Sequence, residues 1–276
     1  MDSVKSTNQL LRRHIALPQD HGSWVFLISP LLVGLFAGGG LNPASFYLIV
    51  AAFSAFLIRQ PTTIAIKVYS GRRPKRELNP AIFWMAVYTL IGGLSLVGLI
   101  LHGYGYVLYL AIPGLPVFAW HLYLVSRRSE RRQLGIELVG SGVLALAAPA
   151  AFWVGIGEPD FTGWILWGLI WLQSAASIVY AYLRLEQRTL SSRPTLTVRF
   201  MMARRALIYS AFNLLLVLAL SVASFVPALL PLPFALQFAE TLWGSIRPAI
   251  GYKPTAIGIR QLLVSSLFTV LFILSW

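Results

Sequence analysis

The chain has 276 residues, of which 57% are hydrophobic and only 11% are charged, and its mean hydropathy is +0.73. Soluble domains carry about 25% charged residues, so this composition excludes an ordinary soluble enzyme and indicates a polytopic membrane protein. The absence of cysteine excludes disulfides and thiolate-bound metals. The net charge of +13 is typical of loops that face anionic membrane lipid. We therefore expect membrane lipid as a partner and no nucleic acid.

Nine stretches approach the length of about 20 mostly apolar residues that a membrane-spanning helix needs. Two of them begin with an Asn-Pro pair, Asn42-Pro43 and Asn79-Pro80, in which asparagine caps the free amides and proline opens the helix. The eighth stretch begins in a cluster of prolines. The nine predicted spans are 23–39, 42–58, 80–101, 104–125, 135–156, 162–183, 205–224, 227–245 and 258–276.

The basic residues alternate between the predicted loops. All 22 Lys and Arg residues fall in the N-terminal segment, in the loops after spans two, four, six and eight or at the span ends that border these loops, and the other loops hold none. Positive residues stay on the cytoplasmic side, so we predict a cytoplasmic N-terminus and an outer C-terminus. Residues 1–22 then form a cytoplasmic segment, and residues 23–276 form one nine-helix domain in a bacterial cytoplasmic membrane or in an internal membrane of similar topology.

Polar residues gather in the cytoplasmic halves of the spans. Span six carries four of them at offsets of 0, 4, 7 and 11, which is one helical face: Gln173, Ser177, Tyr180 and Arg184. Span seven carries Arg205, Tyr209 and Asn213 on one face, and span eight ends with Gln237 and Glu240. Such side chains are costly in hydrocarbon and mark either packing or function.

Two interpretations of these stripes stay open. One is hydrogen bonding between helices, worth about 0.6 kcal/mol for an average pair, with Glu137 paired to Arg131 or Arg132. The other is a cavity open to the cytoplasm, which the basic loops make attractive to a phosphate, diphosphate or carboxylate.

The motif DHGSW, residues 20–24, stands at the cytoplasmic border of span one. Trp24 is typical of an interfacial anchor, whereas His21 is either part of that anchor or an acid–base group that titrates near neutral pH. The chain has no P-loop, no GxSxG elbow and no HExxH motif.

Four segments resemble the YwiC-like family of bacterial membrane proteins. They are spread over most of the chain: LPQDHGSWVFLISPLLVGLFAGG, LIRQPTTIAIK, RRSERRQLGIEL and YKPTAIGIRQ.

The chain also looks like a distant relative of the UbiA prenyltransferase superfamily. The features that resemble it are nine spans, an inside N-terminus, the opening HGSWVFLISPLLVGL, the basic stretch RRPKRELNPAIFW and long cytoplasmic loops after spans two and six. This resemblance implies an all-α, UbiA-like layout whose two long loops flank a cavity facing the cytoplasm.

In that superfamily each of the two loops carries an aspartate-rich motif that holds magnesium and, through it, a prenyl diphosphate. Here residues 59–79 offer only Glu77, and residues 184–205 offer only Glu186. Two lone carboxylates do not build magnesium sites, which need several oxygen ligands. The resemblance therefore implies the architecture without magnesium-dependent chemistry.

These observations predict a protein that binds, and in one version converts, an amphipathic substrate with an anionic head and an isoprenoid or lipid-like tail. Four residues are expected to bind the head: Arg59, Gln60, Lys67 and Arg184. His21 or Glu137 is the acid–base candidate. Five residues are expected to line the site and orient the substrate: Gln173, Ser177, Tyr180, Tyr209 and Asn213.

Two alternatives remain. A transporter or exporter of a small anion or lipid is favoured if a polar path continues outward from Gln173. A non-catalytic membrane partner is favoured if the cavity is closed by its own side chains.

Overall fold

The computed structural model describes residues 10, 12–18, 21–128 and 134–276, and for His21 the backbone only. All regular structure in these ranges is helical, and each predicted apolar stretch contains helix. The elements are α2 (Arg13–Ala16), α3 (His21–Ala37), α4 (Pro43–Tyr69), η1 (Lys75–Glu77), α5 (Leu78–Leu101), η2 (Gly105–Leu110), α6 (Ala111–Ser126), α7 (Leu134–Ala145), α8 (Ala147–Ile156), α9 (Phe161–Gln187), α10 (Leu196–Val222), α11 (Pro231–Ile246) and α12 (Pro254–Ser275).

Seven helical stretches in the described ranges are long and apolar enough to cross a membrane: Pro43–Tyr69, Lys75–Leu101, Gly105–Ser126, Leu134–Ile156, Phe161–Gln187, Leu196–Val222 and Pro254–Ser275. The two remaining predicted spans correspond to shorter helices, because the apolar α3 has 17 residues and α11 has 16. The all-helical, multi-span character expected from composition is confirmed.

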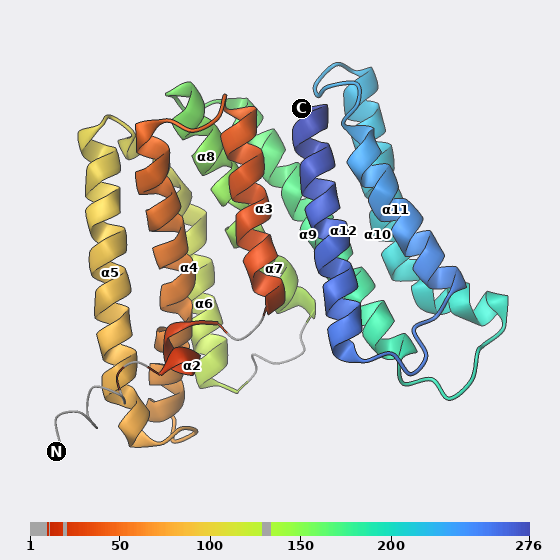
Figure 1. Ribbon diagram of the computed structural model, residues 1–276, viewed down its shortest axis with the longest axis horizontal. Helices are drawn as coiled ribbons and strands as arrows, with labels where there is room; N and C mark the ends of the chain where they lie inside the picture. The colour runs from red at the N-terminus through yellow and green to blue at the C-terminus, as the bar shows by residue number, and fades with distance from the viewer. Residues whose placement is uncertain (1–9, 11, 19–20, 129–133) are drawn as a thin grey trace.

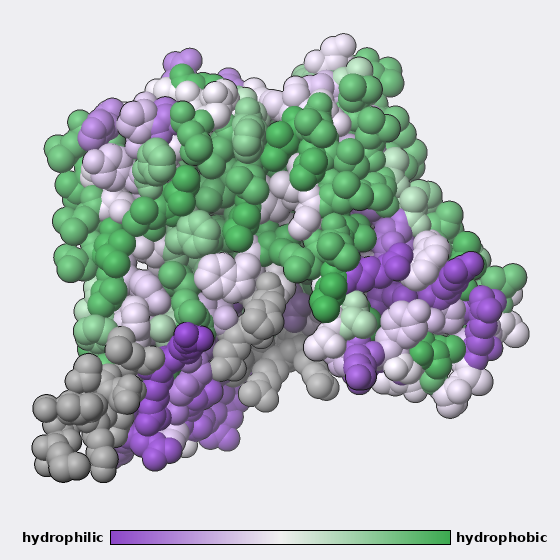
Figure 2. Space-filling model, in the orientation of Figure 1, coloured by the Kyte–Doolittle hydropathy of each residue, from purple (hydrophilic) through white to green (hydrophobic). Residues whose placement is uncertain are grey.

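The long helices lie side by side with their axes roughly aligned, as Figure 1 shows. Helices α4 and α5 form one side of the molecule and α10 and α11 the other, with α3, α9 and α12 between them. Apolar residues cover the middle of the face in Figure 2, and hydrophilic residues gather at the lower ends of both sides. This is the surface expected of a helical bundle that sits in lipid.

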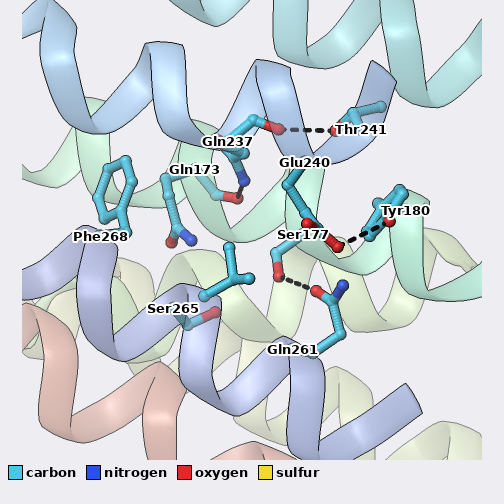
Figure 3. Close-up of a pocket in the computed structure, with 10 residues that line it drawn as sticks. Gln173, Ser177, Tyr180, Gln237, Glu240, Thr241, Gln261, Ser265 and Phe268 are labelled. Carbon is cyan, nitrogen blue, oxygen red and sulfur yellow. Dashed lines mark hydrogen bonds between the residues drawn. The ribbon is translucent and has the colours of Figure 1, made fainter. Parts of the chain in front are cut away.

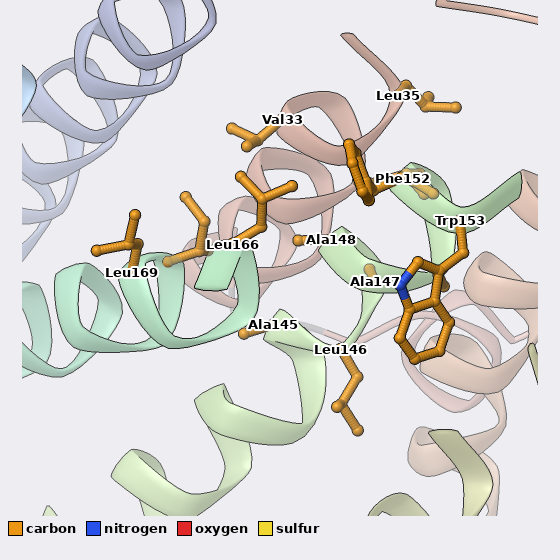
Figure 4. Close-up of a cluster of buried hydrophobic side chains, with 14 of the residues drawn as sticks. Val33, Leu35, Ala145, Leu146, Ala147, Ala148, Phe152, Trp153, Leu166 and Leu169 are labelled. Atoms are coloured by element: carbon orange, nitrogen blue, oxygen red, sulfur yellow. The ribbon is translucent and has the colours of Figure 1, made fainter. Parts of the chain in front are cut away.

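The largest apolar core joins α3 to α7, α8 and α9 (Figure 4). Glycines let the backbones of α3 and α8 touch: a methyl group added at Gly34 would lie 2.2 Å from the carbonyl oxygen of Ala148, and one at Gly155 would lie 2.3 Å from that of Gly38. Close approach through small residues drives helix association in membranes, where lipid removes the hydrophobic advantage of burial. This contact therefore organises the centre of the fold.

Helix ends test the two Asn-Pro signals. Asn42 does cap α4, because its side chain accepts a hydrogen bond from the backbone amide of Ser45 while the Ser45 side chain accepts from Asn42, a reciprocal capping box. The signal at Asn79 is wrong, since the turn η1 leads into α5 and the helix already begins at Leu78. At α9, hydrogen bonds from Thr162 hold the pKa of the Asp160 cap below its ordinary value.

Two predicted boundaries also need correction. The second span was predicted to end at residue 58, but α4 continues as helix to Tyr69, with Pro61 inside it. Residues 184–205 were expected to form a long loop, but α9 runs to Gln187 and α10 begins at Leu196. Both helices continue through polar residues beyond the apolar stretches from which they were predicted. Polar residues can also be helical, because helix formation does not need an apolar surface.

The short helix α2 packs against α4 and α5. Its backbone carbonyls accept hydrogen bonds from two spans, one from Gln60 to His14 (2.9 Å) and one from Tyr88 to Ala16 (3.0 Å). Ile15 is fully buried between these helices. This part of the predicted cytoplasmic segment is thus integrated into the helical domain.

Candidate functional site

The polar stripe predicted on α9 faces α11 and α12. Gln173, Ser177 and Tyr180 line a pocket together with residues of the other two helices (Figure 3). The α11 and α12 residues of this pocket are Gln237, Glu240, Thr241, Gln261, Val264, Ser265 and Phe268. Three helices that are distant in sequence therefore build one polar site.

Hydrogen bonds tie the three helices together inside the pocket. The Ser177 hydroxyl donates to the Gln261 amide oxygen (3.1 Å), and the Gln237 amide nitrogen donates to the backbone carbonyl of Gln173 (2.9 Å). The other amide atom of Gln237, Oε1, is buried and has no hydrogen-bond partner. An unsatisfied buried acceptor costs about 1–3 kcal/mol, and Arg199 Nε and Asn213 Oδ1, outside the pocket, are in the same state.

An ion pair joins Glu240 of α11 to Arg260 of α12. Arg260 donates through Nε (2.6 Å) and Nη2 (2.7 Å) to the two carboxylate oxygens, and the Tyr180 hydroxyl adds a third bond (2.9 Å). The Arg260 guanidinium also lies 3.6 Å from the ring centre of Trp243. The Glu240 side chain is 10% exposed and that of Arg260 is 41% exposed. Glu240 thus lines the pocket, and its partner Arg260 is the more exposed member of the pair.

Arg184 follows Tyr180 by one helical turn and is only 2% exposed. Its Nη1 donates to the Gln187 side chain (2.9 Å) and to the backbone carbonyls of Gly244 (2.9 Å) and Arg247 (2.7 Å). These carbonyls belong to the C-terminal end of α11, where backbone acceptors lack partners within the helix and the helix dipole favours a cation. Arg184 therefore joins α9 to the end of α11 and is already engaged.

A second buried arginine reaches the same helix end from α10. Arg199 donates through Nη1 to the carbonyl of Ile246 (2.5 Å), and Arg193 reaches that carbonyl from the preceding loop (3.2 Å). The C-terminal ends of α9 and α11 and the N-terminal end of α10 are thus held together by guanidinium groups.

The pocket itself is small. Its volume of about 10 Å³ is enough for about one water molecule. Toward the middle of the bundle it ends at Phe268, whose ring packs against Phe234 at 5.1 Å. An amphipathic molecule cannot enter this pocket without moving side chains, so this pocket does not by itself supply the cytoplasm-facing cavity predicted from the sequence.

The predicted head-binding residues do not all meet. Arg184 lies at the α9–α11 contact, whereas Arg59, Gln60 and Lys67 all lie on α4, which packs mainly on α5. Gln60 bonds to α2, and the Arg59 guanidinium lies 5.7 Å from the ring centre of Phe56 on its own helix. The sequence predicted one site from two loops, but the fold separates their residues onto opposite sides of α3.

The other predicted site residues lie outside the pocket. Asn213 is buried and donates to the carbonyl of Leu172 (2.8 Å), while Tyr209 is 37% exposed. Glu137 is exposed on α7 and accepts a hydrogen bond from Tyr182 (2.8 Å). The side chain of His21, like Arg131 and Arg132, lies outside the described residues.

Metal ligands do not gather in the part of the chain that the structure describes, where no three His, Cys, Asp or Glu side chains come together. Glu77, the single carboxylate expected near the first long loop, is bonded to Arg73 (2.9 Å) and lies 3.7 Å from His14.

Sequence reasoning missed the contribution of α12. Gln261, Ser265 and Thr269 recur every four residues, which puts them on one helical face, and Arg260 stands beside them. No site residue was predicted on the last span. Glu240 was noted, but its partner on another helix was not foreseeable from spacing within α11.

The fold and its polar interior define a polytopic, all-helical integral membrane protein. Residues 17–152 match the family model described as YwiC-like protein, and over these residues the predicted resemblance to the YwiC-like family is confirmed. The curated protein YwiC of Bacillus subtilis (strain 168), whose title reads "Uncharacterized protein YwiC", is 28% identical over 161 residues, which are 58% of this chain.

The match spans 61% of the length of that relative. No solved structure matches the chain. The candidate site on α9, α11 and α12 lies beyond the residues that the family model covers, so its role is argued below from its own chemistry.

Proposed function

We propose that the chain crosses a bacterial cytoplasmic membrane nine times, with its N-terminus in the cytoplasm and its C-terminus outside. The support is that all 22 basic residues fall in the N-terminal segment, in alternate predicted loops or at the span ends that border those loops. In addition, α3 starts at the lower end of the molecule in Figure 1 and α12 ends at the upper end, as an odd number of crossings requires. Helices α3 and α11 are roughly 25 Å long at 1.5 Å per residue, which demands local thinning or flanking residues to match the bilayer. A UbiA-like layout rests on the sequence resemblance alone.

We further propose that the cytoplasmic ends of α9, α11 and α12 bind the anionic head of an amphipathic, isoprenoid or lipid-like molecule. The observation that carries this proposal is the half-exposed Arg260, which lies on the face of Trp243 and pairs with Glu240, a residue that lines the buried polar pocket. A guanidinium oriented in this way matches the paired oxygens of a phosphate or carboxylate.

The charge of the surrounding chain supports an anion. Residues 188–276 contain eight Lys and Arg residues but one acidic residue, Glu240. Such an excess of positive charge concentrates anions near the site, and the adjacent bilayer accommodates an apolar tail. Because Glu137 lies on α7 outside the pocket, binding rather than conversion is the function proposed.

A transporter is the second candidate. One observation favours it: the Ser29 hydroxyl bonds to the Thr269 hydroxyl (2.5 Å), which extends the polar face of α12 beyond Ser265 toward the middle of the bundle. The aromatic cluster of Phe234, Phe268 and Phe272 then closes the path, so transport requires these rings to move.

Binding is tested with the full-length protein in nanodiscs, using farnesyl diphosphate as the probe and tryptophan fluorescence as the readout. Farnesol, which lacks the charge, and inorganic diphosphate, which lacks the tail, are the matched probes. We expect farnesyl diphosphate to bind at least tenfold more tightly than either, since a charge-assisted hydrogen bond is worth about 1.5–3 kcal/mol.

Two variants locate the site. Arg260→Gln should weaken binding at least tenfold, because it removes the exposed cation, and Arg260→Lys should recover part of the loss. Arg205→Gln, which removes an exposed arginine of α10 outside the pocket, is the control and should bind like the unaltered protein. Equal binding of farnesol and farnesyl diphosphate, or unaltered binding by Arg260→Gln, contradicts the proposal.

A further inference from the structure

The Glu240 carboxylate has the contacts of a bound ligand. It receives two parallel hydrogen bonds from the Arg260 fork and one from the Tyr180 hydroxyl, an arrangement in which an external carboxylate or phosphate is also held. It is the sole acidic residue of the last 89 residues. In the arrangement described, the protein's own anion fills the place at Arg260.

An external anion at Arg260 therefore competes with Glu240. An external anion can reach Arg260 more easily than it can reach Glu240, because the Arg260 side chain is 41% exposed and the Glu240 side chain is only 10% exposed. Two anions on one guanidinium repel each other, and a carboxylate that loses its cation in a nearly dry pocket is strongly disfavoured in its charged form. Protonation of the displaced Glu240 removes both costs.

The pocket contains an acceptor for such a proton. Gln237 stands three residues before Glu240 on α11, so both lie on one helical face, and both line the pocket. Gln237 is 6% exposed and its Oε1 has no hydrogen-bond partner. A carboxylate cannot satisfy this oxygen because it has no proton to give, whereas a carboxylic acid does so by donating its O–H. The orphaned acceptor is explained if the site alternates with a state in which Glu240 is protonated.

The other charged and titratable groups around Glu240 are compatible with this exchange. Helix α9 contributes Tyr180, which continues to donate to the acid's carbonyl oxygen, and Arg184, whose Nη1 is engaged with backbone carbonyls. Helix α12 contributes Arg260, the α11–α12 connection brings Tyr252 within electrostatic range of Arg260, and the α10 residue nearest the end of α11 is Arg199, bound to Ile246.

We infer that the pocket couples anion binding to proton uptake: an anion takes the place of Glu240 on Arg260, and Glu240 takes one proton from the cytoplasmic solvent. The two Arg260–Glu240 hydrogen bonds break, equivalent bonds form to the ligand, and the new O–H of Glu240 donates to Gln237. This inference rests on the proposed function, because it concerns the same site. It assigns Glu240 as a positioning and coupling residue.

Proton uptake is measured by calorimetric titration of the protein in nanodiscs with farnesyl diphosphate, in two buffers that differ in ionisation enthalpy. Above about pH 8 the probe is fully ionised, because the second ionisation of a phosphate lies near pH 6, so any proton taken up belongs to the protein. We expect about one proton per bound probe and an affinity that falls about tenfold for each added pH unit.

Glu240→Gln should bind the probe without proton uptake and at least tenfold more tightly than the unaltered protein, since Arg260 is no longer held by a carboxylate. Glu186→Gln is the matched control, because Glu186 is an exposed acidic residue of α9 outside the pocket, and its proton uptake should equal that of the unaltered protein.

Binding without proton uptake by the unaltered protein overturns the coupling and leaves the proposed function standing. Undiminished uptake by Glu240→Gln also overturns it, because the proton then goes elsewhere. If the unaltered protein fails to bind the probe, both proposals are lost. Should Glu240→Gln fail to fold, uptake by the unaltered protein together with Glu186→Gln still decides the question.

Discussion

The contact between α3 and α8 and the contact among α9, α11 and α12 solve the same problem in opposite ways. At the first, glycines bring backbones together, and the surroundings are apolar (Figure 4). At the second, amides, hydroxyls and an ion pair fill the interface, and one buried amide oxygen is left without a partner (Figure 3).

The difference separates scaffold from function. Close packing of small residues gains van der Waals contact at no desolvation cost, which suits a permanent contact. A polar interface with an unsatisfied acceptor sacrifices stability, and proteins tolerate such a loss where function needs it. We therefore assign the scaffold to the first region and the site to the second, and three substitutions test that assignment.

The largest effect is expected at the glycine contact. Gly155→Ala places a methyl group 2.3 Å from the carbonyl oxygen of Gly38, so the two backbones must separate, and overpacking of this kind costs about 1–3 kcal/mol. The loss is measured as a lower midpoint of thermal unfolding in detergent. Gly168→Ala on α9, where an added methyl group meets nothing within 4 Å, is the control and should be neutral or slightly stabilising. Equal effects of the two would contradict the scaffold role of α3 and α8.

A smaller effect is expected at the start of α4, which the scaffold also supports. Asn42→Ala removes the capping box and the hydrogen bond from Asn42 to the carbonyl of Val154 on α8 (2.8 Å), so we expect a loss of about 1 kcal/mol. Asn79 stands in the same Asn-Pro sequence but does not cap a helix. Asn79→Ala is therefore the control and should leave the unfolding midpoint unchanged. A loss at both positions would show that helix entry does not explain the difference.

The smallest effect is expected in the polar region. Gln237→Leu removes the unsatisfied oxygen together with one hydrogen bond to the Gln173 carbonyl, so the two changes offset and stability should shift by less than about 1 kcal/mol. The same variant should lose proton-coupled binding of farnesyl diphosphate. A large loss of stability would mean that Gln237 serves the scaffold, and the comparison of the two regions would fail.

Part of the site was predictable because the helical spacing of polar residues can be read directly along the chain. The spacing of Gln173, Ser177 and Tyr180 put them on one face of a helix, and the structure brings these three into the pocket. Arg184 lies one turn further on, engaged with the end of α11.

The remainder depended on which helices become neighbours. Residues of α4 were grouped with those of α9 because both lie near the same predicted membrane face. Depth along the membrane normal follows from the sequence, but position within the membrane plane does not. The partner of Glu240 is therefore Arg260 of the last helix, which no pattern within either helix specifies.

By itself, the sequence determined the class of this protein, the apolar stretches that become helices and the alternation of basic loops, because each depends on the free energy of moving local segments between water and lipid. Only the tertiary structure decided that α9 meets α11 and α12, that Arg260 pairs with Glu240 and that the acceptor of Gln237 is left open. These are consequences of packing between distant helices, and packing is decided by shape and hydrogen bonding across the membrane plane rather than by hydropathy along the chain.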